Sequence, residues 1–162
     1  MKIVSETGPI IGLAKIGNIF LLEKLADEVL IPPMVYKELL GKVGPESEEI
    51  DNALKSFIKT VELPQTEREL QNVISNLDEG EKQAITLAYS YLDNILLLMD
   101  DRAGREAAYK LSIPVTGLLG LLLRLKEKGF IQDIGSFIEG LRQNGYWISD
   151  DIIDIIKHLA GE

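Results

Sequence analysis

Three acidic residues directly follow short apolar segments that resemble β-strands. Glu6 follows KIVS at residues 2–5, and the pair Asp100 and Asp101 follows ILLLM at residues 95–99. A fully apolar run such as ILLLM is typical of a central parallel strand that is covered on both faces. Because ligands of parallel sheets bind at the carboxyl ends of the strands, these acids stand where chemistry is expected. One alternative stays open, since Asp101 can also serve as the N-cap of the helix that follows it.

Glu38 occupies an unusual position on a predicted helix, Pro33–Leu40. At about 100° per residue, its side chain falls inside the apolar arc, between Met34 and Val35. An unpaired carboxylate at the edge of a core is costly. The pattern therefore indicates that Glu38 has a partner or a task.

Glu81 lies in the middle of the apolar stripe of another predicted helix, Glu79–Leu92. Ile85 and Ala88 fall within roughly 80° of it. A structural alternative is equally open here. Asp78 and Glu81, three residues apart, resemble a capping box in which Asp takes the usual Ser or Thr position.

These acids together indicate a hard divalent cation. Carboxylates that converge raise one another's pKa and cannot all ionise without a counter-charge. Oxygen ligands suit Mg²⁺ or Mn²⁺. Zinc is disfavoured, because the chain has no cysteine and His158 is its only histidine. Bound Mg²⁺ orients water, lowers its pKa and stabilises charge on a phosphoryl group, so the pattern favours phosphodiester hydrolysis.

The charge of the chain restricts its partners. The 162 residues carry a net charge of −9, with 26 acids against 17 bases, whereas nucleic-acid binders are usually basic. Either the partner is not a nucleic acid, or some carboxylates hold a metal. Aromatic residues make up only 6% of the chain, which argues against a broad base-stacking platform. We expect no membrane-spanning segment, no signal peptide and a cytoplasmic location, since cysteine is absent and no apolar run approaches ~20 residues.

Strand and helix patterns alternate along the chain, which favours an α/β sandwich with a parallel sheet. A break near Gly17 divides the first helical region, and Lys59–Leu63 is either an extra strand or an extended link. The remaining strands are predicted at Lys2–Ser5, Glu28–Ile31, Ile95–Met99 and Pro114–Thr116. The remaining helices are predicted at Pro9–Ala26, Glu46–Phe57, Glu67–Asn76, Arg102–Leu111, Leu118–Lys128, Asp133–Gln143 and Asp150–Leu159.

Two further features have open interpretations. Arg102 and Arg105 follow the Asp pair and can meet an RNA phosphate, although the pattern favours a solvated helix surface for Arg105. The last helix, Asp150–Leu159, carries five apolar residues on one broad arc. We expect that arc to pack on its own domain, with a dimer or antitoxin surface as the alternative.

Several blocks of the sequence, taken in order, resemble a prokaryotic PIN-domain subfamily of unknown function that is related to VapC-type toxins. The blocks are SETGPIIGLAKIG, VLIPPMVYKELL, LDEGEKQAITLAYSY, ILLLMDDRAGREAAYKLSIPVTGLLGLLLRLKEKG and GYWISDDIIDIIKHLAGE. They run nearly from end to end. The resemblance implies a single domain over residues 1–162, a three-layer α/β/α sandwich with a central, mainly parallel sheet, and a helical extension over about 130–162.

The resemblance also implies an activity and partners. Many PIN domains are Mg²⁺- or Mn²⁺-dependent ribonucleases that cut single-stranded RNA, often as homodimers and often paired with an antitoxin protein. The family's acidic cluster maps onto Glu6, Glu38, Glu81 and Asp100, with Asp101 adjacent. Glu6, Glu38 and Asp100 would hold the metal, and Glu81 would help to orient the attacking water. Thr7 and Thr116 would position water or phosphate, with Arg102 and Arg105 near the substrate.

One departure from the family pattern divides the functional hypotheses. The first acid of the family is usually the Asp of a DTGP block, whereas this chain has Glu6. The extra methylene moves the carboxylate by about 1.5 Å. A misplacement of roughly 1 Å can cost ~10²-fold in rate. The first hypothesis is therefore a metal-dependent endoribonuclease, and the alternative is a catalytically weakened PIN fold that binds RNA or a protein.

Overall fold

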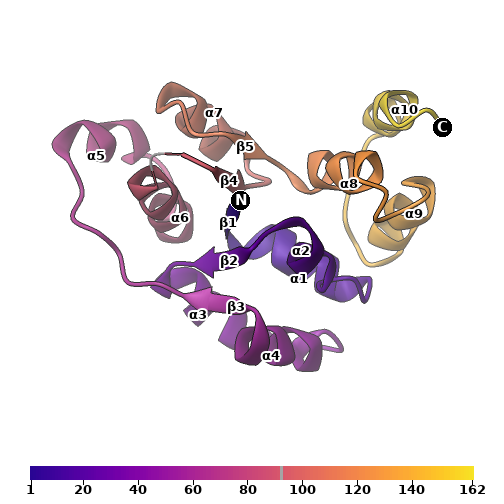
Figure 1. Cartoon of the computed structure of the whole chain (residues 1–162), viewed down its shortest axis with the longest axis horizontal. Helices are drawn as coiled ribbons and strands as arrows, with labels where there is room; N and C mark the ends of the chain where they lie inside the picture. The colour runs from indigo at the N-terminus through magenta and orange to yellow at the C-terminus, as the bar shows by residue number, and fades with distance from the viewer. Residues whose placement is uncertain (92) are drawn as a thin grey trace.

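A parallel five-stranded sheet forms the centre of the molecule. The computed structural model describes residues 1–91 and 93–162. The strand order is β3-β2-β1-β4-β5, and each neighbouring pair is parallel (Figure 1). The strands are β1 (Lys2–Ser5), β2 (Glu28–Ile31), β3 (Ile58–Thr60), β4 (Ile95–Leu98) and β5 (Val115–Thr116).

Alternation along the strands divides the core into two layers. Ile3 pairs with Val29 and Leu96, and all three pack in the cluster on one face. Their successors Val4 and Leu30 pack in the cluster on the other face. Since successive side chains of a strand point to opposite faces, this alternation requires helices on both sides. The prediction of an α/β/α sandwich is confirmed, and the sheet is entirely parallel in the part of the chain described.

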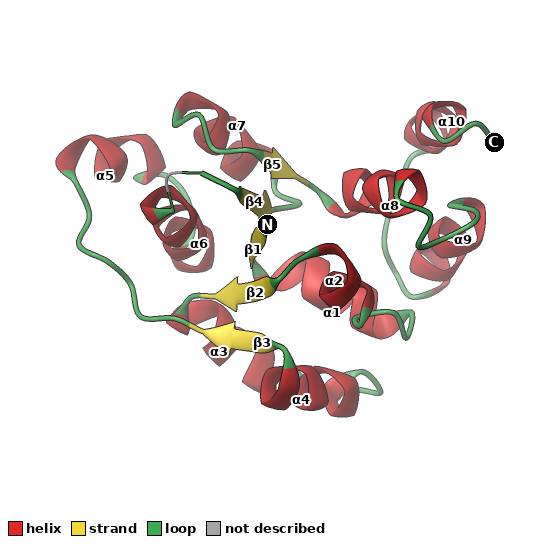
Figure 2. Ribbon diagram, viewed as in Figure 1, coloured by secondary structure: helices red, strands yellow, loops and turns green. Residues whose placement is uncertain are grey.

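Helices cover both faces, as Figure 2 shows in red around the yellow strands. The first face carries α1 (Thr7–Lys15), α2 (Leu21–Leu25), α3 (Pro33–Leu40), α4 (Ser47–Ser56), α8 (Leu118–Glu127), α9 (Gly135–Gln143) and α10 (Asp150–Leu159). The second carries α5 (Arg68–Ile74), α6 (Glu79–Ser90) and α7 (Arg102–Lys110). Helices α8, α9 and α10 group together toward the C-terminus (Figure 1).

Most predicted boundaries agree with the observed ones within two residues. The break in the first helical region is confirmed, because Gly17 adopts a positive φ of 69° between α1 and α2. The open alternative for Lys59–Leu63 is decided in favour of a strand, which begins one residue earlier, at Ile58. The predicted end of α6 at Leu92 lies outside the described residues.

One expectation about an apolar face was wrong. The arc on α10 does not pack fully on its own domain, because only Ile153 is buried, whereas Ile155 and Leu159 are 58% and 65% exposed. On α3, Val35 and Leu39 are buried but Leu40 is exposed. The buried arc of α3 is therefore narrower than its apolar arc.

Among residues 1–91 and 93–162, no helix combines the length and the hydropathy needed to span a bilayer.

The strand order places a crevice between β1 and β4. The chain leaves β1 toward β2 and β3 on one side, and β4 and β5 lie on the other. Such a reversal of strand order leaves a gap at the carboxyl edge, which is where ligands of open α/β sheets bind. The N–H of Glu6 donates to the carbonyl of Leu98 at 3.1 Å, so β1 and β4 end side by side at this crevice.

Candidate active site

Glu6 and Asp100 meet at the crevice. Glu6 Oε1 accepts a hydrogen bond from the Asp100 N–H at 2.7 Å. Asp100 Oδ1 accepts one from the Leu118 N–H at 2.8 Å, at the start of α8. Gly8 leaves room between them, since a Cβ at this position would lie 3.6 Å from both Glu6 Oε1 and Asp100 Oδ2. Residues 94 positions apart in the sequence therefore form one carboxylate pair.

One oxygen of this pair has no partner. Asp100 Oδ2 is buried and makes no hydrogen bond. Burial raises the pKa of Asp100, and the Leu118 N–H and the charge of Arg105 offset this only in part. A buried carboxylate oxygen without a donor is costly, and such an atom needs an explanation. A cation at the crevice would provide one.

Burial also raises the pKa of Glu6, from its ordinary value of 4.5 to about 7. The Asp100 N–H opposes this shift, while the negative charges of Asp100 and Glu81 add to it. Glu6 is one of the few buried charged or polar side chains of the described fold, at 9% exposure. Strongly perturbed carboxyl groups in a cleft are characteristic of functional sites.

The facing wall of the crevice comes from α3 and α6. A cavity of about 220 Å³ is lined by Glu6, Thr7, Gly8, Glu38, Asp78, Gly80, Glu81 and Asp101. Glu38 Oε2 accepts a hydrogen bond from the Thr7 hydroxyl at 2.8 Å. Burial raises the pKa of Glu81, to which the charges of Asp78 and Asp101 contribute. All five acids predicted from strand ends and helix faces therefore lie in or beside one cavity, with Asp100 beside it.

Both structural alternatives for the acids hold in the structure. Asp78 and Glu81 form the complete capping box of α6, with Asp78 Oδ1 accepting from the Glu81 N–H at 2.8 Å. Asp101 caps α7, accepting from the Gly104 N–H at 2.8 Å. Each of these residues also lines the acidic cavity. Capping fixes the side chains at helix starts and does not remove them from the site.

Of the four other predicted site residues, only Thr7 lines the acidic cavity, and Thr116, Arg102 and Arg105 do not. Thr7 lines the cavity, whereas Thr116, at the end of β5, lies against Gly120 and is absent from the cavity wall. Arg102 has a largely exposed side chain that pairs with Glu106 at 3.2 Å. The solvated alternative for Arg105 was wrong. Its guanidinium donates to the carbonyl oxygens of Met99 and Asp100 and holds the end of β4 in place.

The donor set fits Mg²⁺ or Mn²⁺ through two carboxylates. Within residues 1–91 and 93–162, no three His, Cys, Asp or Glu side chains converge closely enough to hold a metal as they stand. Each of the five carboxylates instead accepts a hydrogen bond from a donor of the chain itself. Mg²⁺ usually binds through one or two carboxylates and keeps several waters. Glu6 and the unpartnered Oδ2 of Asp100 supply such a pair.

Sequence reasoning missed three residues of the cavity. Asp78, Gly8 and Gly80 line it, and a Cβ at Gly80 would collide with Glu38 Oε1. The signal was present in the DEGE segment at 78–81, where Gly is an unusual choice for a first helical turn. A larger residue there would force the Glu38 carboxylate to shift, because α3 and α6 approach closely at the cavity.

The fold and the crevice define a class: α/β/α proteins with an acidic site at the carboxyl edge of a parallel sheet. A family model described as DUF3368, PIN domain, matches residues 2–162. The chain belongs to the PIN-domain family, and PIN domains are generally nucleases. A search among curated proteins finds no match to this chain.

Proposed function

We propose that this protein is a Mg²⁺- or Mn²⁺-dependent endoribonuclease that hydrolyses phosphodiester bonds of single-stranded RNA. The observation that carries the proposal is the buried Oδ2 of Asp100, which has no hydrogen-bond partner and lies beside Glu6 at the crevice. Membership of the PIN-domain family supports the reaction class.

Each acid has a role that follows from its position. Glu6 and Asp100 would hold the metal, with Glu38 facing them across the cavity of about 220 Å³. Bound metal supplies a water of lowered pKa and neutralises charge on the phosphoryl group. Glu81, whose pKa is raised by burial, would accept a proton from the attacking water.

Neighbouring residues would keep this arrangement in place. Thr7 orients Glu38 through its hydroxyl, and Asp101 stabilises the start of α7 beside the cavity. Arg105 fixes the backbone at Asp100, and Arg102, exposed at the start of α7, can contact a phosphate of the strand. Thr116 supports the start of α8 from the end of β5.

A second candidate function rests on Glu6. Its side chain is one methylene longer than the Asp usual in this family, and its carboxylate is turned to the Asp100 N–H. If that geometry prevents productive metal binding, the protein is a PIN fold that acts by binding RNA or a protein. The Glu6→Asp variant separates the two functions.

The proposed interactions with other proteins rest on α10. Ile155 and Leu159 expose an apolar strip that single-domain packing leaves uncovered. We assign this strip to a homodimer contact or to an antitoxin partner in the cytoplasm. Sedimentation of the purified wild type and of Ile155→Glu distinguishes these. A homodimer would form from this chain alone and would be dissociated by the substitution, whereas an antitoxin surface would leave both proteins monomeric.

The test is cleavage of a fluorophore-labelled single-stranded RNA of mixed sequence in Mn²⁺ and in EDTA. Wild type, Asp100→Asn and Glu6→Asp are compared, with Asp51→Asn as the matched control on the exposed surface of α4. We expect cutting by wild type and by Asp51→Asn in Mn²⁺ only, and none by Asp100→Asn.

The outcomes separate the two candidates. Activity gained only in Glu6→Asp would identify the natural protein as a binding module. Cutting by wild type that persists in EDTA or in Asp100→Asn would contradict the proposed site.

A further inference from the structure

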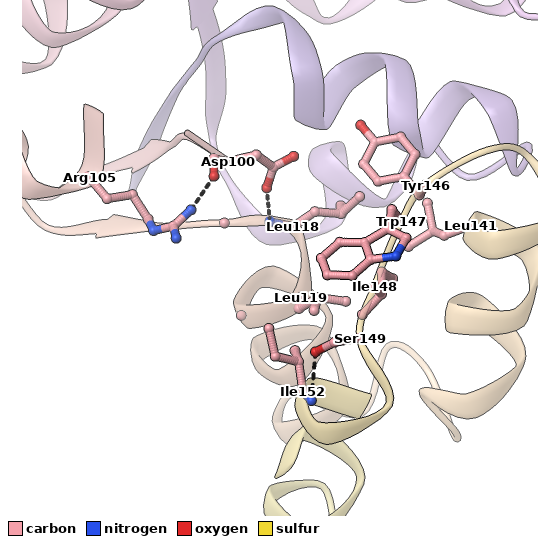
Figure 3. A pocket seen from close by; sticks show the side chains of 12 residues that line it. Asp100, Arg105, Leu118, Leu119, Leu141, Tyr146, Trp147, Ile148, Ser149 and Ile152 are labelled. Atoms are coloured by element: carbon pink, nitrogen blue, oxygen red, sulfur yellow. Dashed lines mark hydrogen bonds between the residues drawn. The ribbon is translucent and has the colours of Figure 1, made fainter. Parts of the chain in front are cut away.

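A second pocket opens on the other side of Asp100. It has a volume of about 420 Å³ and lies between the start of α8 and the segment that joins α9 to α10 (Figure 3). Asp100 and Arg105 lie at one end, and its walls are largely apolar, with Leu118, Leu119 and Ile148 among them. The volume is within the range of about 300–1,000 Å³ typical of small-ligand sites. Asp100 lines this pocket, and its hydrogen-bond partner Glu6 lines the acidic cavity, so the two pockets adjoin at the Glu6–Asp100 pair.

Trp147 is the most unusual residue of this pocket. It is the only tryptophan of the chain, and it is 86% exposed although it lines the pocket. Figure 3 shows its indole ring projecting among the apolar side chains of the pocket. Large aromatic rings normally contribute to cores, and an exposed one in a concave site is characteristic of recognition.

The backbone on both sides of Trp147 is fixed. The hydroxyl of Tyr146 donates to the carbonyl of Gly8 at 2.6 Å, which ties this segment to α1 beside the acidic cavity. The carbonyl of Ile148 accepts from Arg142 at 2.8 Å, and the side chain of Ile148 is buried. The ring is therefore presented by a rigid segment, which lowers the entropic cost of binding a flat ligand.

We propose that this pocket binds one unpaired nucleobase of the RNA strand, stacked on Trp147, while the adjoining phosphate lies at the acidic cavity. This inference rests on the proposed function and adds the subsite that selects a single-stranded substrate. Every base offers a flat π-face for stacking on an aromatic ring, and only an unpaired base can leave its own stack to do so. Arg105 lines this pocket beside Asp100 and supplies a positive charge at that end.

The shape of the site favours a base over a protein segment. A stable protein contact needs roughly 1,200 Å² or more of buried surface in total, whereas this is a local hollow that ends at a carboxylate. An apolar peptide would leave the buried Asp100 without a complement. A nucleotide supplies both a flat apolar ring and an anionic group that a bound metal can accept.

The test uses the emission of the single tryptophan, which reports directly on its ring. A short single-stranded RNA is titrated in EDTA at low salt, so that binding is measured without cleavage. An oligonucleotide of the same length that lacks bases and an RNA duplex serve as matched probes. We expect quenching by the single-stranded RNA only. Binding to variants is followed by the anisotropy of a labelled RNA.

Three variants complete the experiment. Trp147→Ala should weaken RNA binding about tenfold, since stacking on an aromatic ring is lost. Trp147→Phe should bind within about twofold of wild type. Phe130→Ala removes another exposed aromatic residue, beyond the opposite end of α8, and should change nothing. In Mn²⁺, Trp147→Ala should raise KM about tenfold and leave kcat unchanged, because the ring lies away from the reacting bond.

The possible outcomes test the base-binding subsite and the proposed nuclease activity separately. RNA that binds without quenching, and equally to Trp147→Ala, would overturn the subsite even if cleavage is observed. So would quenching by an apolar peptide with none by RNA, which would assign the pocket to a protein partner. Quenching by RNA without any metal-dependent cleavage would leave the subsite standing and reject the nuclease.

Discussion

The two pockets that adjoin at the Glu6–Asp100 pair are built in opposite ways. The acidic cavity is formed by side chains at the ends of strands and the starts of helices, and most of their carboxylates are held by backbone N–H groups. The Trp147 pocket is formed mostly by apolar side chains, and its outer wall comes from the segment between α9 and α10. Hydrogen bonds hold the carboxylates that line the first pocket, whereas apolar side chains make up most of the walls of the second.

This difference indicates that buried charge lowers the stability of the fold at the acidic cavity and not at the Trp147 pocket. Buried carboxylates cost free energy unless they are paired, and burial raises the pKa of both Glu6 and Asp100. The apolar walls of the other pocket need no partner and carry no such cost. We therefore expect substitutions of the acids to change catalysis and stability in opposite directions, and substitutions in the Trp147 pocket to change mainly RNA binding.

The largest expected effect tests whether the two halves are separable at Asp100, which lines the Trp147 pocket and is hydrogen-bonded to Glu6 of the acidic cavity. Asp100→Asn keeps an oxygen for the Leu118 N–H but loses the charge of the unpartnered oxygen. Cleavage should fall at least about 100-fold, as expected for a lost metal ligand. Quenching of Trp147 by single-stranded RNA should stay within about twofold of wild type. A parallel loss of quenching would show that the two pockets are one site.

The second prediction concerns the strain in the acidic half. The folded-state pKa of Glu6 is about 7 against an ordinary value of 4.5, so the free energy of unfolding falls as pH rises between these values. Glu6→Gln cannot ionise and avoids this loss. In EDTA at pH 8 it should be more stable than wild type by up to about 3 kcal/mol, and near pH 4 the two should be equal. Urea unfolding at both pH values measures this.

Addition of Mn²⁺ provides the control for that prediction. The metal should stabilise wild type at pH 8 and narrow the gap to Glu6→Gln, because the variant has lost one proposed ligand. A wild type as stable as Glu6→Gln at pH 8 in EDTA would contradict the assignment of strain to Glu6.

The third prediction tests the close approach of α3 and α6. A methyl group at Gly80 would collide with Glu38 Oε1 and displace its carboxylate from Thr7. Gly80→Ala should weaken Mn²⁺ binding about tenfold in calorimetry. Its Tm should stay near that of wild type, because alanine favours the helix by about 0.5–1 kcal/mol. Gly41→Ala, where a Cβ would make only ordinary contacts of 3.5 Å or more, is the matched control.

The smallest expected effect concerns the contact between the two halves. Tyr146→Phe removes the hydrogen bond to the Gly8 carbonyl and should cost about 1 kcal/mol in the free energy of unfolding. KM for RNA should rise modestly, since the segment that presents Trp147 loses one anchor. Tyr109→Phe, at a tyrosine that is 65% exposed, should leave both quantities unchanged.

The sequence by itself determined the order of elements and the acids worth attention. Alternation and period are local properties, so ILLLM predicted a covered central strand and the position of Glu38 on its helix predicted an inward carboxylate. The Asp78 and Glu81 spacing predicted a capping box, and it is present. The PIN-domain resemblance is confirmed over residues 2–162. The single-domain boundaries stay a prediction.

Only the tertiary structure decided which side chains meet. Strand order set β4 beside β1 and so joined Glu6 to Asp100, and no local pattern encodes that pairing. Arg105 donates to the carbonyl groups of Met99 and Asp100, directly after β4, and Trp147 is exposed although an apolar residue is expected in the core. The surroundings of Arg105 and of Trp147 depend on which surfaces the rest of the fold covers. The type of a residue gives only a preference for burial or exposure, whereas its actual burial is decided when the chain is assembled.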